Sequence, residues 1–325
     1  MRISVVIATY RRAKSLRRTL STIAAQSSRP EEVIIVDQSP PDERADVEKA
    51  AEEAQGAGLC VRLITSELPS STRSRNIGLA AAKGEWVVFS DDDVDWPDHT
   101  LAKLKAKVSA SPDLALVAAR DSCAPTDPRP LWRRFLAAIF LTNTLWPLRR
   151  GKVLACMQAR YPQPIVGDMS TEWAAGYWFA VDRHFVSRMG LSFDERMTRY
   201  AQAEDMLFSH QLFMKAAPAG RTCVLSEDIC VAHLVSQEWR EAQDFADLCN
   251  AWNRIYIAST LRAGFRFWLS LFAICWAAIH QVLVRIMRGR AWLGHLRAHA
   301  VALANLQAIR SGDFERLYSR YERRR

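Results

Sequence analysis

The chain has 325 residues, of which 49% are hydrophobic and 24% charged, a composition typical of a globular protein with a sizeable core. Its net charge of +9 is unevenly placed, because residues 251–325 hold 13 Arg, no Lys and three acidic residues, which leaves residues 1–250 close to neutral. This distribution excludes a strongly basic nucleic-acid groove in the first 250 residues, and we expect no nucleic-acid partner. It favours an anionic surface that meets the C-terminal region.

The cysteines and the N-terminal residues indicate in which cellular compartment the protein is expected. The seven cysteines are scattered and none forms a C-x-x-C pair, so we expect neither a zinc site nor a disulfide framework. A reducing compartment fits this usage. The first residues enter a strand pattern at once, and their apolar run is too short for a signal peptide.

Buried strands alternate with helices over the first 120 residues. The strands are short apolar runs, and the segments between them have helical spacing or end at Gly or Pro. This alternation predicts a mainly parallel sheet covered by helices. The predicted strands are Ile3–Ala8, Glu32–Asp37, Leu59–Thr65, Trp86–Phe89 and Leu114–Ala119, and the predicted helices are Arg11–Gln26, Arg44–Gln55, Ser70–Ala82 and Pro97 to about Ala110.

Two of these strands end in residues that suit a nucleotide. Ala8 ends the first strand and is followed by Thr9 and Tyr10, and Asp37 ends the second. Because ligands of open α/β sheets bind beside the carboxyl ends of strands, Asp37 suits a ribose or base donor and Tyr10 suits stacking on a base. The sequence has neither a G-x-G-x-x-G motif nor a P-loop, which argues against a dinucleotide site.

Three consecutive carboxylates, Asp91, Asp92 and Asp93, follow the strand Trp86–Phe89. On an extended segment alternate side chains point the same way, so Asp91 and Asp93 can share one face. Two carboxylates held close together favour a cation between them, and hard oxygen ligands suit Mg²⁺ or Mn²⁺. The alternative is a solvated acidic turn before the next helix, which the three aspartates taken alone fit better.

Four ordered motifs change that balance. They are Ser4-Val-Val-Ile-Ala-Thr-Tyr-Arg-Arg, Val33-Ile-Ile-Val-Asp, Ser74-Arg-Asn-Ile-Gly-Leu and Gly84-Glu-Trp-Val-Val-Phe-Ser-Asp-Asp-Asp. Together they closely resemble the family 2 glycosyltransferases of the GT-A fold, over roughly Arg2 to His233. The resemblance implies an inverting transfer of a sugar from a nucleotide-diphosphate donor, assisted by a divalent metal.

The resemblance also assigns roles to single residues. It places Asp91 and Asp93 on the D-x-D metal motif. Arg75 falls at the position where family members often have an arginine near the donor. The expected donor-binding residues are Ala8, Thr9, Tyr10, Asp37, Arg75, Asp91 and Asp92. Gln38 departs from the family pattern, because many members carry a second acidic residue there. The resemblance therefore leaves the base of the donor nucleotide open.

Glu204 and Asp205 open a predicted amphipathic helix. Acidic residues in a first turn are stabilised by the helix dipole, which would suffice to explain them. A transferase also needs a carboxylate that takes the proton from the attacking hydroxyl, and the pair resembles the family's base motif. We expect Asp205 to be the base, with Glu204 as the neighbouring candidate.

His233 follows at the spacing where family members often place a histidine near the metal or the diphosphate. We therefore include it among the metal residues with Asp91 and Asp93, although a lone histidine is often structural.

Two segments lie between Asp93 and His233. Glu172–Asp182 is a predicted strand in which Gly176 suggests a close approach to a ligand. Leu131–Leu148 is a predicted helix that suits a packed surface helix and a membrane- or acceptor-facing element equally well.

The last part of the chain differs in character. Phe267–Val284 is uncharged over 18 residues and flanked by Arg266 and Arg285, which is at the lower limit for a membrane span. His280, Gln281 and the short length favour a helix that lies in the plane of the membrane or enters it and returns on the same side. The alternative is an ordinary helical hairpin packed on the globule.

The sequence thus predicts an α/β protein of the GT-A fold with a C-terminal helical, membrane-associating region. Residues 1–235 would form the catalytic domain, with 1–120 as the nucleotide-sugar-binding half and 121–235 as the acceptor half, and residues 236–325 the C-terminal region. We expect a metal-dependent transfer to a glycan or lipid-linked acceptor at the cytoplasmic face of the cell membrane, with the protein attached peripherally or through one inserted C-terminal helix. A sugar-nucleotide-binding module without turnover and a metal-dependent nucleotidyltransferase are the alternatives.

Overall fold

The computed structural model describes residues 1–124, 131–199, 201–238 and 242–322, and in helices it leaves out the side chains of residues 131 and 320–322. The chain divides into two compact units. Unit 1 consists of Met1–Pro125, Pro164–Asp194 and Glu204–Arg240, and unit 2 of Thr126–Gln163, Glu195–Ala203 and Glu241–Arg325. Each unit is described separately below.

Unit 1 is built on one sheet, whose strand order is β3-β2-β1-β4-β10-β6-β11-β5, with β9 paired to β11. The strands β1, β2, β3 and β4 run parallel to one another, whereas β10 is antiparallel to both of its neighbours. Their bounds are β1 Ile3–Thr9, β2 Glu32–Asp37, β3 Val61–Thr65, β4 Trp86–Ser90, β5 Val94–Asp95, β6 Leu114–Asp121, β9 Met169–Ser170, β10 Trp178–Asp182 and β11 Thr222–His233.

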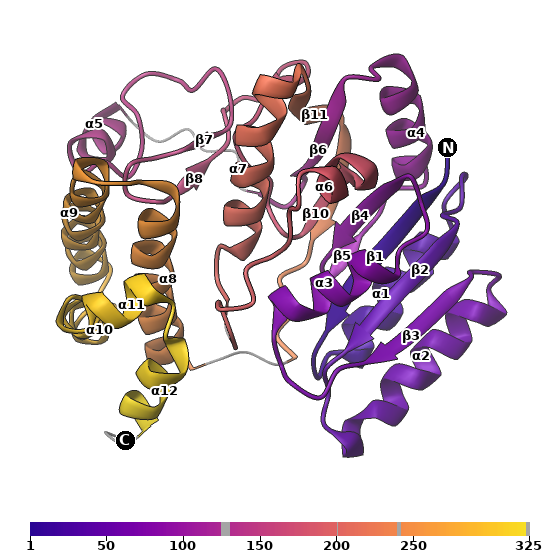
Figure 1. The fold of residues 1–325 in the computed structure, drawn as a ribbon, viewed down its shortest axis with the longest axis horizontal. Coiled ribbons are helices and arrows are strands. Elements are labelled where there is room, and N and C mark those ends of the chain that lie inside the picture. The colour runs from indigo at the N-terminus through magenta and orange to yellow at the C-terminus, as the bar shows by residue number, and fades with distance from the viewer. Residues whose placement is uncertain (125–130, 200, 239–241, 323–325) are drawn as a thin grey trace. The chain divides into compact units, whose positions relative to one another are not determined.

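Helices cover both faces of this sheet (Figure 1). Alternate residues of the central strands, such as Val5 of β1 and Val88 of β4, join one buried cluster with the apolar sides of α1, α2 and α4. The helices of unit 1 are α1 Ala13–Ala24, α2 Arg44–Gly56, α3 Ser71–Ala81, α4 Thr100–Ala110, α6 Arg183–Arg188 and α7 Glu204–Ala216. Burial on both faces explains why the strands read as continuous apolar runs.

The opposite face of the sheet carries an aromatic cluster. Phe89 of β4 lies 5.1 Å from Phe179 of β10 between ring centroids, and Phe193 stacks on Phe208 of α7 at 4.2 Å. Helix α3 approaches this face at Gly78, where an added Cβ would clash with the side chain of Val6. The cluster fixes α7, and with it the carboxylates of its first turn, against the central strands.

Unit 2 is helical. Its helices are α5 Leu131–Ile139, α8 Gln243–Leu261, α9 Phe265–Met287, α10 Leu293–Ala304, α11 Leu306–Ser311 and α12 Phe314–Glu322, and a short hairpin joins β7 Lys152–Val153 to β8 Ala159–Arg160. Helix α8 packs against α9, α10 and α11. By length and composition alone, α9 is long and apolar enough to cross a membrane.

Several predicted bounds differ from the structure. The helix predicted over Leu131–Leu148 ends at Ile139, and the strand predicted over Glu172–Asp182 begins only at Trp178, so Gly176 lies in the loop before it. The N-cap of α3 is Ser70, whose hydroxyl accepts from the amide of Arg73. Residues 131–163 belong to the same compact unit as the C-terminal helices.

Candidate active site

The carboxyl ends of β1, β2 and β4 bring the predicted donor residues together. Thr9 pairs in register with Asp37, and Ile7 pairs with Ser90, so the residues after Ile7 and Ser90 emerge at the same edge of the sheet. Asp37 is buried and its Oδ1 accepts from the amide of Ser39 at 2.9 Å. Tyr10 lies beside Arg11, whose guanidinium stands 5.8 Å from the centroid of the Tyr10 ring.

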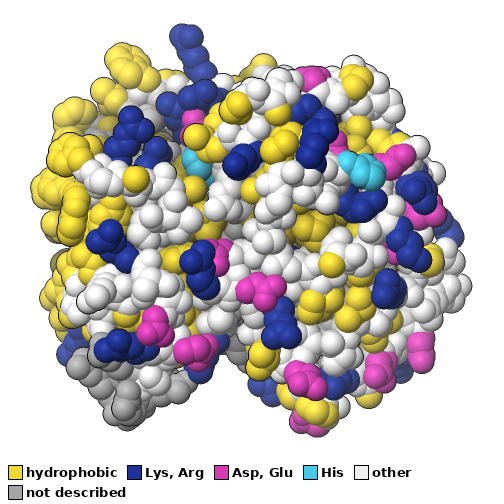
Figure 2. Space-filling view, in the orientation of Figure 1, with side chains coloured by type: hydrophobic (Ala, Val, Ile, Leu, Met, Phe, Trp, Pro, Cys, Tyr) yellow, Lys and Arg dark blue, Asp and Glu magenta, His cyan; other side chains and the backbone are white. Residues whose placement is uncertain are grey.

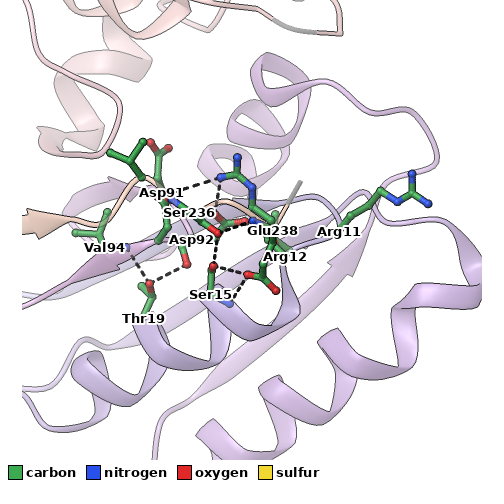
Figure 3. Close-up of polar contacts among 12 residues, drawn as sticks. Arg11, Arg12, Ser15, Thr19, Asp91, Asp92, Val94, Ser236 and Glu238 are labelled. Carbon is green, nitrogen blue, oxygen red and sulfur yellow. Dashed lines mark hydrogen bonds and ion pairs between the residues drawn. The ribbon is translucent and has the colours of Figure 1, made fainter. Parts of the chain in front are cut away.

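The three aspartates after β4 form a tight turn that leads into β5. Helix α1 holds this turn through Thr19, whose hydroxyl donates to the carbonyl of Asp92 at 2.8 Å and accepts from the amide of Val94 at 3.0 Å (Figure 3). Asp92 and Asp93 are only 4% and 3% exposed, so the alternative of a solvated acidic turn is wrong. Residues 92–93 form a turn, and not the extended segment from which a shared face of Asp91 and Asp93 was predicted.

The middle carboxylate, Asp92, is bound by residues of β1 and of the loop that follows it. Its Oδ2 accepts from the hydroxyl of Thr9 at 2.7 Å, and its Oδ1 lies 3.3 Å from Nη1 of Arg12. Burial raises the pKa of Asp92 to about 7 against the opposing effect of Arg12. In Figure 3 Arg12 points towards the aspartates, whereas Arg11 points away from them. Asp92 therefore ties the acidic turn to β1.

Asp91, Asp93 and His233 each offer a ligand atom, and these atoms lie within 4.8 Å of one another. Asp93 Oδ1 is buried and, among the described residues, makes no hydrogen bond, with His233 Nε2 at 3.3 Å as its nearest ionic neighbour. The side chain of Asp91 is 35% exposed, which leaves the group open to solvent on one side. Two carboxylates and an imidazole with an unsatisfied buried oxygen fit a divalent cation such as Mn²⁺ or Mg²⁺.

His233 is held from two sides. Its amide donates to Asp121 Oδ1 at 3.0 Å, and its ring stacks on the ring of Tyr177 with centroids 5.4 Å apart. Tyr177 is fixed in turn by its hydroxyl, which donates to the carbonyl of Ala119 at 2.8 Å, and its own carbonyl accepts from the amide of Asp91. The position of the imidazole is therefore set before any ligand binds.

Asp93 also binds the segment that follows β11. Its Oδ2 accepts from the amide of Ser236 at 2.8 Å, and the hydroxyls of Ser236 and Ser15 lie 2.8 Å apart. Glu238 accepts from the amide of Ser15 at the same distance (Figure 3). Burial alone would raise the pKa of Asp93, but the neighbouring His233 ring, the hydrogen bond from the amide of Ser236 and the charge of Arg12 lower that pKa, so Asp93 is a carboxylate at neutral pH.

Arg75 connects the acidic turn to helix α7. Its side chain is 6% exposed, with Nη2 donating to Asp91 Oδ1 at 2.9 Å and Nη1 donating to Glu204 Oε1 at 2.7 Å. Its Nη2 also lies 3.3 Å from the carbonyl oxygen of Gly176, and the guanidinium stands 5.5 Å from the centroid of the Phe193 ring. One buried cation thus joins residues that lie far apart in the sequence.

Glu204 and Asp205 occupy the first turn of α7, as the sequence predicts. Asp205 accepts from the amide of Gly176 through Oδ2 and from the amide of Met206 through Oδ1, the latter at 2.7 Å. Burial raises the pKa of both carboxyls, and Arg75 opposes that rise. A carboxylate whose pKa is raised towards neutrality is a stronger base than one at the surface.

The structure brings the predicted residues to one edge of the sheet and adds several that sequence reasoning missed. Arg12, Thr19, Tyr177 and Ser236 all contact the acidic turn or its ligands. Arg12 ends the first of the four sequence motifs, and its positive charge was the one feature that could have indicated a contact with the aspartates. Thr19 acts through its hydroxyl on backbone atoms of the turn, Ser236 through its amide and Tyr177 through its ring face, and no local sequence pattern indicates these contacts.

Comparison with known proteins gives the family. The sequence profile of glycosyl transferase family 2 matches residues 4–187, more than half of the chain. The chain is 34% identical over 104 residues to an uncharacterised glycosyltransferase of Nostoc sp., and 37% identical over 97 residues to the amylovoran biosynthesis glycosyltransferase AmsB of Erwinia amylovora. These matches cover 32% and 29% of this chain and 32% and 31% of the relatives, so each spans about a third of either protein.

A solved structure shows the same fold over nearly the whole chain. The mannosyltransferase PcManGT of Pyrobaculum calidifontis, in complex with GDP-Man and Mn²⁺, superposes with a TM-score of 0.54 at 21% identity. The match covers 95% of this chain and 82% of that one. The fold is therefore GT-A, and the matched profile, together with the strand-end residues described above, shows that the chain belongs to glycosyl transferase family 2.

Proposed function

We propose that this glycosyltransferase moves a sugar from a nucleotide-diphosphate donor to a hydroxyl of a glycan or lipid-linked acceptor, with inversion at the anomeric carbon. The observation that carries the proposal is the link made by Arg75. It joins Asp91, one of three residues suited to a divalent ion, to Glu204 beside the candidate base Asp205. Donor activation and acceptor deprotonation would then take place side by side.

The donor would lie along the ends of β1, β2 and β4. Thr9 and Asp37 would face the nucleoside, with Ala8 and Tyr10 flanking it. A divalent ion held by Asp91, Asp93 and His233 would stabilise the negative charge that develops on the leaving diphosphate. Arg75 would add a fixed positive charge at the same place, and its clamped geometry means that little reorganisation is required.

The transfer would be a single displacement. The acceptor oxygen attacks the anomeric carbon from the face opposite the nucleotide, the bond from that carbon to the diphosphate oxygen breaks, and its electron pair leaves with the diphosphate. Asp205 takes the proton of the acceptor hydroxyl. Two backbone amides hold its carboxylate in place, and burial raises its pKa, which supports its role as base.

The base assignment is tested with Asp205→Asn, with Glu204→Gln as its matched control. Loss of the base should slow transfer by a factor on the order of 10²–10⁴ while donor binding is kept. Because both oxygens of Asp205 accept backbone hydrogen bonds and an amide can accept only through one, thermal unfolding of each variant has to be measured beside the rate. A folded Asp205→Asn variant that transfers at the wild-type rate would move the role to Glu204.

The metal assignment is tested with Asp93→Ala, and Asp95→Ala serves as control because Asp95 pairs with Arg18 outside the cluster. Calorimetry should show Mn²⁺ binding to the wild-type protein and to the control, and none to Asp93→Ala. Equal Mn²⁺ affinity in all three proteins would remove Asp93 from the site.

Mn²⁺-dependent thermal stabilisation by UDP-, GDP- and dTDP-sugars would identify the base of the donor nucleotide, because ligands that bind the folded state raise its apparent stability.

The acceptor and the location belong to the same proposal. The similarity to AmsB, named for amylovoran biosynthesis, supports a glycan acceptor. The apolar helix α9 and the basic C-terminal region support action at the cytoplasmic face of the cell membrane. An acceptor carried on a lipid would explain why a catalytic unit is joined to such a region.

A further inference from the structure

Unit 2 exposes far more apolar surface than unit 1. Of the 23 large hydrophobic side chains that are exposed among the described residues, 17 belong to unit 2. Figure 2 shows yellow side chains gathered where Figure 1 draws α5 and α9. An exposed apolar patch that is contiguous and rimmed by charge marks a docking surface.

The exposed residues of α9 follow one stripe of the helix. At 3.6 residues per turn, the exposed hydrophobic residues fall on one side of the helix: Phe265, Trp268, Leu269, Phe272, Ile279, Leu283, Ile286 and Met287. The opposite stripe, which includes Phe267, Leu271 and Ile274, is buried in unit 2, where α9 packs against α8 and α10. Helix α9 is therefore apolar on two sides, and its neighbours α8 and α10 cover only one of them.

Helix α5 continues this stripe. Trp132, Phe135 and Ile139 are exposed at helical spacing on α5. The two helices meet where the indole nitrogen of Trp276 donates to the carbonyl of Ile139 at 2.8 Å. The ring of Trp276 stacks on Phe140, with centroids 5.2 Å apart, and on Phe272, with centroids 6.1 Å apart. These residues of α5 and α9 form one continuous apolar surface, named here the α5–α9 surface.

The charge around this surface has one sign. Residues 131–163 contain five Arg and one Lys, and residues 248–312 contain eight Arg, and neither segment has a single Asp or Glu. Arg133, Arg149, Arg150 and Arg266 are exposed in these two segments, and the guanidinium of Arg133 stands 5.1 Å from the centroid of the Trp132 ring. Aromatic and aliphatic side chains accompanied by basic residues match a bilayer with anionic headgroups.

Helix α9 is long enough to span a bilayer, since 23 residues extend about 35 Å. Its surroundings argue against a span. A spanning helix would take α8 into the membrane with it, because α9 packs along α8 and Arg285 binds Asp247 of α8 through two contacts of 2.7 Å. Helix α8 also carries Asp244 and Arg254, charges that are costly inside hydrocarbon.

We infer that the α5–α9 surface docks in the plane of an anionic lipid bilayer, with α9 lying along the membrane and not crossing it. The inference deepens the proposed location and rests on it, but it does not depend on the transfer chemistry. The exposed side chains of both helices enter the boundary between headgroups and acyl chains, and the arginine rim contacts the headgroups. The buried stripe of α9 stays in contact with the bundle.

The surface is tested by flotation of the full chain with vesicles of neutral phosphatidylcholine, with or without about one third anionic phosphatidylglycerol. We expect binding to the anionic vesicles that weakens in high salt without being lost. Phe272→Glu should lower the bound fraction at least about tenfold, whereas Met214→Glu, at a similarly exposed residue on a helix of unit 1, should leave it unchanged. Absence of vesicle binding by the wild-type protein, or equal effects of the two substitutions, would overturn the inference.

The in-plane orientation is tested separately by labelling both ends of α9. Arg266→Cys and Met287→Cys are placed, one at a time, in a protein in which the exposed Cys60 and Cys123 are serine. On inside-out membrane vesicles from expressing cells, a membrane-impermeant maleimide should react with both positions, because both ends face the cytoplasmic side. Reaction at only one end would show a spanning helix and contradict the inference.

Two controls separate this inference from its alternatives. Sedimentation without lipid should show a monomer. A dimer that Phe272→Glu dissociates, together with no vesicle binding, would mean that a second copy covers the surface. Asp93→Ala should still bind vesicles, and Phe272→Glu should still bind Mn²⁺ and donor. Loss of docking alone therefore refutes the membrane inference, and loss of donor or metal binding alone refutes the catalytic proposal.

Discussion

Gly176 is the point at which the candidate base and the bridging arginine come closest to the backbone. A Cβ added at Gly176 would lie 2.9 Å from Arg75 Nη2, 3.1 Å from Asp205 Oδ2 and 3.3 Å from Asp205 Cβ. Gly176 does not have a positive φ, so alanine fits its backbone conformation without strain. The effect of Gly176→Ala should therefore come from contact with these two side chains alone.

Neither Arg75 nor Asp205 can move away from the added methyl group without losing hydrogen bonds. Arg75 is clamped by Asp91 and Glu204, and Asp205 is bound to the amide of Gly176 itself. Forcing an extra methyl group into such a site costs about 1–3 kcal/mol of stability. For a unit of this size that lowers the midpoint of thermal unfolding by roughly 2–4 °C for each kcal/mol. Transfer should fall by a larger factor, on the order of 10², since a displacement of about 1 Å at reacting groups has that effect.

Thermal unfolding and steady-state transfer of Gly176→Ala measure the two effects, with Gly56→Ala as the matched control. Gly56 ends α2 with nothing within 4 Å of an added Cβ, so its substitution should be neutral or slightly stabilising. If the methyl group acts through Arg75, Gly176→Ala should cost less in an Arg75→Ala background, a coupling of about 0.5–3 kcal/mol. Wild-type stability and activity in Gly176→Ala would refute this account of the site.

Two further predictions concern parts of the chain away from Gly176. Thr19→Val keeps the shape of the side chain but leaves the carbonyl of Asp92 and the amide of Val94 without their partner, so denaturant unfolding should show a loss of about 1–3 kcal/mol, with weaker Mn²⁺ binding by calorimetry. Ser21→Ala, at an exposed hydroxyl on the same helix, should change neither, and equal behaviour of the two variants would contradict the role of Thr19. In unit 2, burial lowers the pKa of His299 from 6.5 to about 4, so the folded protein binds fewer protons than the unfolded chain in that window. Stability should therefore fall as the pH drops from about 6.5 to 4, and His299→Gln should flatten this part of a pH series of unfolding midpoints. An unchanged slope in His299→Gln would assign the acid sensitivity to other groups.

Much of the site was predictable because its residues sit beside strongly patterned elements. The apolar runs of β1, β2 and β4 are buried on both faces, so the residues that follow them had to emerge at one sheet edge, and Thr9, Asp37 and Asp91 do so. Glu204 and Asp205 were placed correctly because an acidic first turn is a local signal of a helix start. In each case the information lies within a few residues of the side chain concerned.

The bounds of irregular segments were less predictable. Leu131–Leu148 is largely apolar, yet α5 ends at Ile139, because the next residues turn back and the hydroxyl of Thr142 donates to the carbonyl of Ala137. The segment before β10 has strand-like composition, but its amides and carbonyls bind Arg75, Asp91 and Asp205 in place of a neighbouring strand. Partners of this kind come from distant parts of the chain and leave no periodicity behind.

By itself, the sequence determined the alternation of strands and helices, the sheet edge at which the candidate donor residues lie, the three consecutive aspartates after β4 and the basic, apolar character of the C-terminal region. Tertiary structure alone decided which groups meet. The insertion of β10 antiparallel between β4 and β6 brings Gly176 and Tyr177 to the aspartates, and packing of α9 against its bundle decides which of its apolar stripes stays exposed. The physical reason is that periodicity records burial along one segment, whereas pairing and packing depend on the free energy of contacts between segments distant in sequence.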